Sequence, residues 1–332
     1  MSETVGATAV VDRTAPPATR RWAGMELRNL GLVLVLVLLA IVGLLTSDTF
    51  GTPGNINNIL VSSSVTGVVT VGVTLVIIGG GIDLSVGALV ALASVWATTL
   101  QTQSYGPWVM VLTALVVGVV AGLVNGLLIA YGQLVAFIVT LAMLVSARGL
   151  AARIAENRTQ IVNDTTIKDI AKTDVLGLPV LVIILAVVVA IGWLVLNRTT
   201  FGRRTLAIGG NAEAARLAGI DVRRTTTILY MISGLCCGIA AVMLMARTTT
   251  GSSTHGNLLE LDAIAAAIIG GTLLAGGRGT IIGSLLGVIV FTMISNIFIL
   301  NNLATETQNI AKGLIIIGAV LLQRRATRTR TT

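Results

Sequence analysis

Apolar runs alternate with short polar or glycine-rich segments along almost the whole chain. Ten such runs follow a polar leader, and most of them approach the roughly 20 apolar residues that a helix needs to cross a bilayer. The pattern predicts an all-α, polytopic membrane protein with about ten transmembrane helices. The expected spans are 27–46, 56–79, 84–101, 107–130, 134–153, 178–197, 224–247, 261–276, 280–300 and 307–322.

Two of the boundaries between spans are glycine-rich breaks. They separate the second span from the third and the eighth from the ninth, so each pair could form one bent or re-entrant element, and the count lies between nine and eleven. The strings GGIDLSVGAL (80–89) and GGRGTIIGSL (276–285) share a glycine pair, a later glycine and a leucine at the same spacing. An internal repeat, which is common in transporters, and a chance similarity in glycine-rich sequence both remain open.

Composition supports lipid as the solvent. Of the 332 residues, 55% are hydrophobic and 11% are charged, whereas a soluble domain has about 25% charged residues. The adjacent Cys236 and Cys237 lie in an apolar run and are expected to be packing residues without a disulfide. The first apolar run has no cleavage site after it and is expected to be a retained anchor helix.

The net charge of +8 is concentrated in the two tails and one loop. The positive-inside rule therefore places both termini and the arginine-rich loop 198–223 in the cytoplasm, and the loop 154–177 outside. Arg148 and Arg153, near the outer end of the fifth span, run against this topology. The predicted division is a disordered cytoplasmic tail over 1–26, a transmembrane domain over 27–323 and a basic cytoplasmic tail over 324–332.

The sequence lacks the residues that several kinds of catalytic and binding site require. The segment nearest to a P-loop, GTLLAGGR (271–278), has Gly277 where the phosphate-binding lysine would stand. His255 is the only histidine and has no partners for a metal site, so a polar surface position is expected. No catalytic set and no aromatic-interleaved basic surface for nucleic acid is visible. The sequence predicts no metal, cofactor or catalytic residue, and hence no enzyme.

Asp83 is the only acidic residue between Asp48 and Glu156, and it follows three glycines. A carboxylate inside a membrane protein usually has a function, but an aspartate just before a helix can also cap it. Both interpretations remain open, and we expect the segment 79–85 to form a bend beside the transport path. The candidate residues of the path or gate are Gly79, Gly80, Gly81, Asp83, Ser85 and Asn125.

Two spans carry glycines four residues apart. These are Gly118, Gly122 and Gly126 in one span, and Gly279, Gly283 and Gly287 in the other. Such a stripe lets another helix approach closely. Packing within the bundle is one explanation, and a subunit interface is the alternative.

The loop 198–223 contains a short Ala-rich helix over 212–218. Asn211 can cap its start and Gly219 can end it. Glu213 near the start and Arg216 near the end both suit the helix dipole. A short helix of small residues between two spans has a shape suited to docking into a cleft on another protein.

Three strings in this order resemble the permease subunits of bacterial sugar ABC importers, the ribose/xylose/arabinose group. They are GGGIDLSVGALVAL, FGRRTLAIGGNAEAARLAGIDVRRTTTILYMISG and AAAIIGGTLLAGGRGTIIGSLLGVIV, and the similarity spans about residues 55 to 322. The resemblance implies a multi-pass protein of the bacterial inner or plasma membrane. It translocates a monosaccharide, such as a ribose-like pentose, but has no ATPase site of its own.

The resemblance also implies partners. These are a second permease subunit, a cytoplasmic ABC ATPase with tandem nucleotide-binding domains that binds the ATP and Mg, and an extracytoplasmic sugar-binding protein. The short helix then corresponds to the element that couples the permease to the ATPase. The coupling residues on the matched motif are Asn211, Glu213, Ala214, Ala215, Arg216 and Gly219.

Other solutes and another mechanism stay open. Related ABC permeases carry nucleosides, autoinducer-type furanoses or branched-chain amino acids. An ion-coupled secondary sugar carrier would also be a ten-span bundle, although such carriers normally need several intramembrane carboxylates. The sequence does not identify the sugar.

Overall fold

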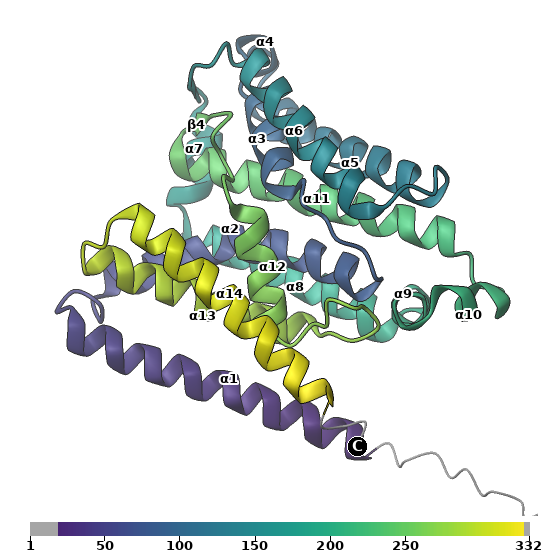
Figure 1. Ribbon diagram of the computed structural model, residues 1–332. Helices are drawn as coiled ribbons and strands as arrows, with labels where there is room; N and C mark the ends of the chain where they lie inside the picture. The colour runs from purple at the N-terminus through teal and green to yellow at the C-terminus, as the bar shows by residue number, and fades with distance from the viewer. Residues whose placement is uncertain (1–18, 329–332) are drawn as a thin grey trace, which may run out of the picture.

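The computed structural model describes residues 19–328, with side chains described for 30–318 and for Leu321. These residues form a bundle of helices with two small sheets near one end (Figure 1). The helices are α1 (Thr19–Thr46), α2 (Pro53–Ile78), α3 (Val86–Ala97), α4 (Leu100–Ser104), α5 (Pro107–Ala130), α6 (Ala136–Ile154), α7 (Thr165–Lys172), α8 (Val180–Arg198), α9 (Thr200–Gly210), α10 (Ala212–Leu217), α11 (Val222–Thr248), α12 (Leu259–Ile269), α13 (Ile281–Leu300) and α14 (Thr305–Arg328). The strands are β1 (Gln160–Ile161), β2 (Asp174–Val175), β3 (Leu178–Pro179) and β4 (Thr250–Gly251), paired antiparallel as β1 with β4 and β2 with β3.

Each expected span contains a helix, but the helices differ in length. Six of the described helices, α2, α5, α6, α8, α11 and α13, are long and apolar enough to cross a membrane. The third expected span, 84–101, contains a helix of only 12 residues, α3, which is about 18 Å long at 1.5 Å per residue. Helix α12 has 11 residues. Both are shorter than the roughly 30 Å of a hydrocarbon core. Helix α3 ends at Ala97, and α12 ends at Ile269, just before the second glycine-rich break.

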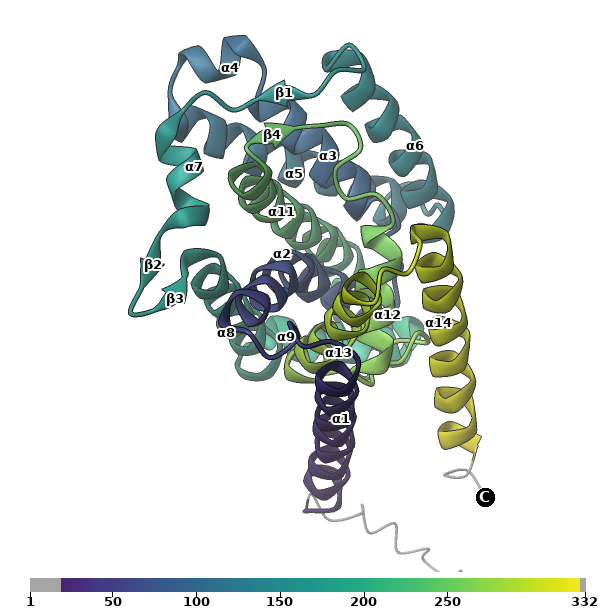
Figure 2. The ribbon, with the colours of Figure 1, turned by 90° about the vertical axis from the view of Figure 1, so that its left-hand side faces the viewer.

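The bundle has two ends, which we call the α10 end and the β4 end. They are separated by α11, whose 27 residues span about 40 Å. The start of α1, the end of α14 and the α9–α10 segment lie toward the α10 end, whereas α4, α7 and the paired strands lie toward the β4 end (Figures 1 and 2). The loops 198–223 and 154–177 are therefore at opposite ends of the molecule.

The two tails are shorter than expected. Helix α1 begins at Thr19, so residues 19–26 of the expected disordered tail are helical, and residues 1–18 lie outside the described residues. Helix α14 continues to Arg328, which takes up part of the expected basic tail, and residues 329–332 also lie outside the described part.

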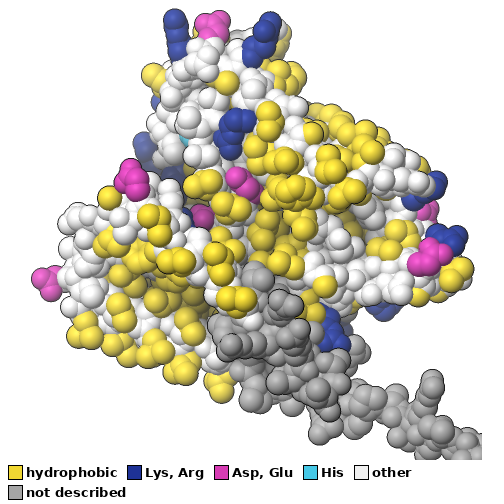
Figure 3. All heavy atoms as spheres, viewed as in Figure 1, with side chains coloured by type: hydrophobic (Ala, Val, Ile, Leu, Met, Phe, Trp, Pro, Cys, Tyr) yellow, Lys and Arg dark blue, Asp and Glu magenta, His cyan; other side chains and the backbone are white. Residues whose placement is uncertain are grey.

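The core is built on α2 and α11. The most apolar stretch of α2 is 83% buried and that of α11 is 67% buried, whereas that of α6 is only 22% buried. Hydrophobic side chains cover much of the middle of the visible face, and many charged side chains lie near its edges (Figure 3). This distribution fits a bundle whose outer helices face lipid.

Both glycine stripes serve packing within the chain. A Cβ added at Gly118 would overlap the carbonyl oxygen of Gly234 in α11, and one at Gly122 would overlap that of Tyr230. The second stripe does the same, since a Cβ at Gly287 would overlap the carbonyl oxygen of Ala266 in α12. The close approach of backbones that the stripes predict is therefore found, and it joins helices of one chain.

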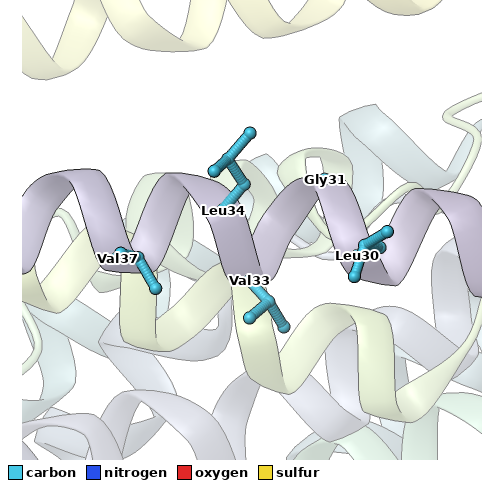
Figure 4. Close-up of a pocket in the computed structure, with 5 residues that line it drawn as sticks. All are labelled: Leu30, Gly31, Val33, Leu34 and Val37. Carbon is cyan, nitrogen blue, oxygen red and sulfur yellow. The ribbon is translucent and has the colours of Figure 1, made fainter.

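Helix α1 lies at the periphery. An open space of about 450 Å³ runs along its middle, lined by Leu30, Gly31, Val33, Leu34 and Val37 (Figure 4). Only residues of α1 line this space, and Leu30 and Leu34 are 69% and 60% exposed. The space is thus an uncovered apolar helix face and does not have the polar groups of a solute site.

Candidate transport and coupling site

Three glycine pairs from distant parts of the sequence meet toward the α10 end. They are Gly79–Gly80 after α2, Gly209–Gly210 at the end of α9, and Gly276–Gly277 in the break after α12, and we call them the glycine junction. The Gly277 amide donates a hydrogen bond of 2.9 Å to the carbonyl of Ile78. A Cβ added at Gly209 would overlap that same carbonyl oxygen and lie 2.5 Å from the Gly277 nitrogen. The backbones of α9 and both breaks are therefore in direct contact.

A glycine in each break has the same left-handed backbone conformation. Gly80 and Gly276, the first glycines of the two similar strings, have φ angles of +85° and +83°. A Cβ at Gly276 would lie 2.9 Å from the Cα of Gly80, so the two positions are also neighbours. Left-handed φ values favour glycine. A helix follows each break, α3 from Val86 and α13 from Ile281. When the two strings are aligned, the starts of these helices differ by one position.

A small recess adjoins the first break. Its volume is about 170 Å³, and it is enclosed by the ends of α2 and α5, the starts of α6 and α11, and the α9–α10 segment. Most of its side chains are apolar, with Thr226 and Tyr230 as polar groups. The lining residues are Val76, Gly79, Gly80, Gly81, Ile129, Ala136, Ile208, Ala212, Val222, Thr226, Leu229 and Tyr230.

Asp83 lies in a separate, fully buried cluster of polar residues. Its Oδ1 accepts hydrogen bonds from the Ser85 amide at 3.0 Å and the Ser85 hydroxyl at 2.6 Å. Its Oδ2 accepts a hydrogen bond of 2.8 Å from Ser233 in α11. Asn125 in α5 completes the cluster by donating to the Ser85 hydroxyl oxygen at 3.0 Å. We call Asp83, Ser85, Asn125 and Ser233 the Asp83 cluster, and it joins the break to α5 and α11.

The expectation that Asp83 caps the third span requires a correction. The N-cap residue of α3 is Ser85, and its side chain makes no capping bond. Asp83 stands two residues earlier and fixes the segment before the helix. The carbonyl of Ile82 is held as well, by the Tyr230 hydroxyl at 3.1 Å and the Thr140 hydroxyl at 3.3 Å. The carboxylate is therefore a tether between the extended break and α11.

One atom of the cluster has no partner. The Oδ1 of Asn125 is buried and accepts no hydrogen bond within the described part of the chain. The amide orientation is fixed, because the Ser85 hydroxyl already donates to Asp83 and can only accept from Asn125. An acceptor left over in this way is suited to an ordered water molecule.

Helix α10 has the caps that the sequence predicts. The Oδ1 of Asn211 accepts a hydrogen bond of 2.9 Å from the Ala214 amide, and Gly219 ends the helix with φ +80°. Arg216 and Glu213 form an exposed ion pair, in which the Arg216 Nη2 lies 2.6 Å from the Glu213 Oε1. This pairing lowers the pKa of Glu213 and raises that of Arg216. Ala215 is buried, so α10 rests on the bundle with one face and exposes its charges on another.

At the β4 end, Arg148, one of the two arginines that run against the predicted topology, acts as a clamp on a loop. The Arg148 guanidinium in α6 donates to the carbonyls of Ser253 at 2.7 Å and His255 at 2.6 Å. It also donates to the carbonyl of Gly256 at 3.4 Å. Arg148 thus holds the loop that leads into α12. The contacts give Arg148 a structural function within the chain.

His255 is not the freely exposed polar residue that the sequence suggests. It is half-buried, and its ring nitrogens lie 3.2 Å from the Ser94 hydroxyl and 3.5 Å from the Thr248 hydroxyl. Burial, together with the charge of Arg148, lowers the pKa of His255 to about 4. The ring is therefore a neutral hydrogen-bonding group in the loop of the β4 end.

The structure brings some candidates together and separates others. Asp83, Ser85 and Asn125 share one cluster, whereas the glycines at 79–81 border the recess and the junction. Sequence reasoning missed Ser233 and the whole of α9. The double glycine at 209–210, placed next to the cap Asn211, was the available signal, but spacing alone does not indicate that it meets the two breaks.

Comparison with known proteins gives one consistent result. A family model described as the permease component of branched-chain amino acid transport systems matches residues 55–320. The chain is 37% identical to the ribose import permease protein RbsC of Bacillus subtilis, covering 90% of this chain and 94% of the relative. It is 36% identical to the L-arabinose permease AraH of Azospirillum brasilense (93% and 92%) and 30% identical to the xylose permease XylH of Escherichia coli (93% and 95%). No solved structure matches the chain.

Proposed function

The chain belongs to the ABC permease family of the ribose, L-arabinose and xylose permeases, and on that premise we propose that it is the membrane-spanning subunit of a monosaccharide importer. The observation that carries the proposal is the near-complete coverage of three sugar permeases at 30–37% identity. The protein is a multi-pass component of a bacterial inner or plasma membrane, and a ribose-like pentose is the favoured solute.

The proposed topology has ten membrane segments and both termini in the cytoplasm. In support of it, the start of α1, the end of α14 and α10 lie toward the same end of the bundle (Figure 1). The arginine-rich loop 198–223 is at that end, which the positive-inside rule assigns to the cytoplasm. The short helices α3 and α12 cross together with their breaks, where protein contacts hold backbone groups such as the Ile82 carbonyl and the Gly277 amide.

Energy comes from a separate ABC ATPase in this proposal, with ATP and Mg bound there. The ATPase, of the kind with tandem nucleotide-binding domains, docks on α10 and a second copy or close paralogue of the permease completes the path. An extracytoplasmic binding protein delivers the sugar at the β4 end. Exposure of Glu213 and Arg216 at the tip of the bundle supports docking there. The path itself runs beside the break at 79–85.

Docking on α10 can be tested with two variants. Arg216→Glu reverses an exposed charge and breaks the pair with Glu213, and Gly219→Pro removes the φ +80° residue that ends the helix. We expect both variants to insert but to lose ATPase binding in a pull-down and to lose uptake. Lys172→Glu, at the opposite end of the bundle, is the matched control and should behave as wild type. Full ATPase binding and normal uptake in the α10 variants would contradict this docking site.

The solute can be tested by vesicle uptake. The permease is reconstituted with its cognate ATPase and binding protein, and labelled ribose, L-arabinose, xylose and leucine are compared. Leucine is included because the family model is described by branched-chain amino acid transport. We expect saturable uptake of a pentose and none of leucine. The reverse result would replace the sugar proposal with an amino acid permease.

A further inference from the structure

The α9–α10 segment is rigidly connected to the glycine junction. Asn211 is at once the C-cap of α9 and the N-cap of α10, so no flexible linker separates the two helices. The last turn of α9 carries Gly209, which contacts the end of α2 and the second break. A displacement of α10 is therefore passed directly to α9 and, through Gly209, to the junction.

The contacts at the junction are between backbones. A side chain at an interface can change rotamer and absorb a small movement, whereas backbones in contact cannot. Close-packed interiors transmit strain for this reason. The Gly277 amide is also hydrogen-bonded to the Ile78 carbonyl, so the two breaks are fastened to each other as well as to α9.

Each break adjoins a short helix that lacks the length to span a bilayer. The first leads from α2 into α3, and the second leads from α12 into α13. A movement at the junction would thus act on both helix pairs, α2–α3 and α12–α13, at the same time. Two breaks that moved independently would not need a common backbone contact with α9.

We propose that Gly209 is a positioning residue that transmits movement of the α9–α10 segment to both helix breaks at once. This inference rests on the proposed function, because it assumes that an ATPase drives α10. It adds a specific point of transmission, the contact of Gly209 with the Ile78 carbonyl and with Gly277.

Two substitutions separate transmission from helix propensity. Gly209→Ala places a methyl group against the Ile78 carbonyl, whereas Gly149→Ala in α6 adds the same methyl group in open space, away from the junction. In reconstituted vesicles we measure the amount of sugar transported per ATP hydrolysed. For Gly209→Ala we expect this ratio to fall about tenfold or more while ATPase binding is kept, because small misplacements can cost about a hundredfold in rate. For Gly149→Ala the ratio should stay within about twofold of wild type, as expected for a substitution without a clash.

A second measurement covers the case in which Gly209→Ala does not fold. Spin labels are placed on Leu217→Cys in α10 and Ala275→Cys in the second break, both exposed, with a third on Thr254→Cys at the β4 end as a reference. The native Cys236 and Cys237 are buried. On trapping the ATP-bound complex, the distance from α10 to the break should stay constant, while both should move relative to the reference.

The outcomes distinguish the two proposals. If the wild-type complex transports no solute with ATP, the proposed function fails. If wild type transports but Gly209→Ala keeps normal coupling, only the inference about the junction is overturned. A changed distance between α10 and the second break during the cycle would also overturn it, because the junction would then not move as one body.

Discussion

Replacing Asp83 tests whether its carboxylate acts as a tether. Asp83→Ala leaves three buried donors without their acceptor: the Ser85 amide, the Ser85 hydroxyl and the Ser233 hydroxyl. An unsatisfied buried donor costs about 1–3 kcal/mol. The two hydroxyls can rotate towards other acceptors but the amide cannot, so we expect a loss of about 2–5 kcal/mol in the free energy of unfolding.

Asp83→Asn keeps the shape of the side chain. Its oxygen can accept from Ser85, and its amide group can donate to the Ser233 oxygen, which then acts as the acceptor. The loss of charge-assisted bonds is offset because a buried charge no longer has to be desolvated. We therefore expect the unfolding free energy of this variant to lie within about 1 kcal/mol of wild type.

The assay combines unfolding in mixed micelles with vesicle uptake. Asp48→Ala is the matched control, because Asp48 is exposed in the segment between α1 and α2. If the carboxylate is a tether, stability and uptake should both decrease from wild type to Asp83→Asn to Asp83→Ala. The Asp48→Ala control should match wild type in both. If Asp83→Asn folds as wild type but does not transport, the negative charge itself takes part in gating or solute passage. If the Asp83→Asn variant is as unstable as the Asp83→Ala variant, the hydrogen-bond reasoning is refuted.

The clamp, the loop histidine and the first glycine stripe give further predictions. Arg148→Gln should expose the loop before α12 to protease, whereas Arg153→Gln, an exposed residue of the same helix, should not; equal cleavage would contradict the clamp. Because the pKa of His255 falls from 6.5 to about 4 on folding, the unfolded chain binds the proton more readily. The free energy of unfolding should thus decrease as pH drops through 6.5 towards 4, and an equal decrease in His255→Gln would refute this. Gly118→Leu should prevent stable folding, measured by gel filtration, while Gly149→Ala, with open space around its Cβ, should be tolerated.

Hydropathy predicts the helices well and their lengths poorly. A window of apolar residues identifies α2, α5, α8, α11 and α13, since each is a continuous helix. It also extended the third span to residue 101, although α3 ends at Ala97, because apolar composition does not show where a helix ends. The glycines at 79–81 marked the break but not how far it extends.

The candidate site shows the same limit. Caps are local, so Asn211 and Gly219 could be assigned from neighbouring residues alone. The partners of Asp83 are not local, because Ser233 is 150 positions away in the chain. The meeting of Gly209 with Ile78 and Gly277 is likewise a property of the bundle, and sequence spacing contains no information about it.

The most direct test of a permease driven by a separate ATPase is the energy source of uptake. Proteoliposomes holding the permease, its cognate ATPase and the sugar-bound binding protein are given ATP and Mg without an ion gradient, or a proton or sodium gradient without ATP. The account predicts accumulation of the sugar with ATP alone and none with a gradient alone. Accumulation driven by a gradient in vesicles containing only this chain would contradict it and establish an ion-coupled carrier.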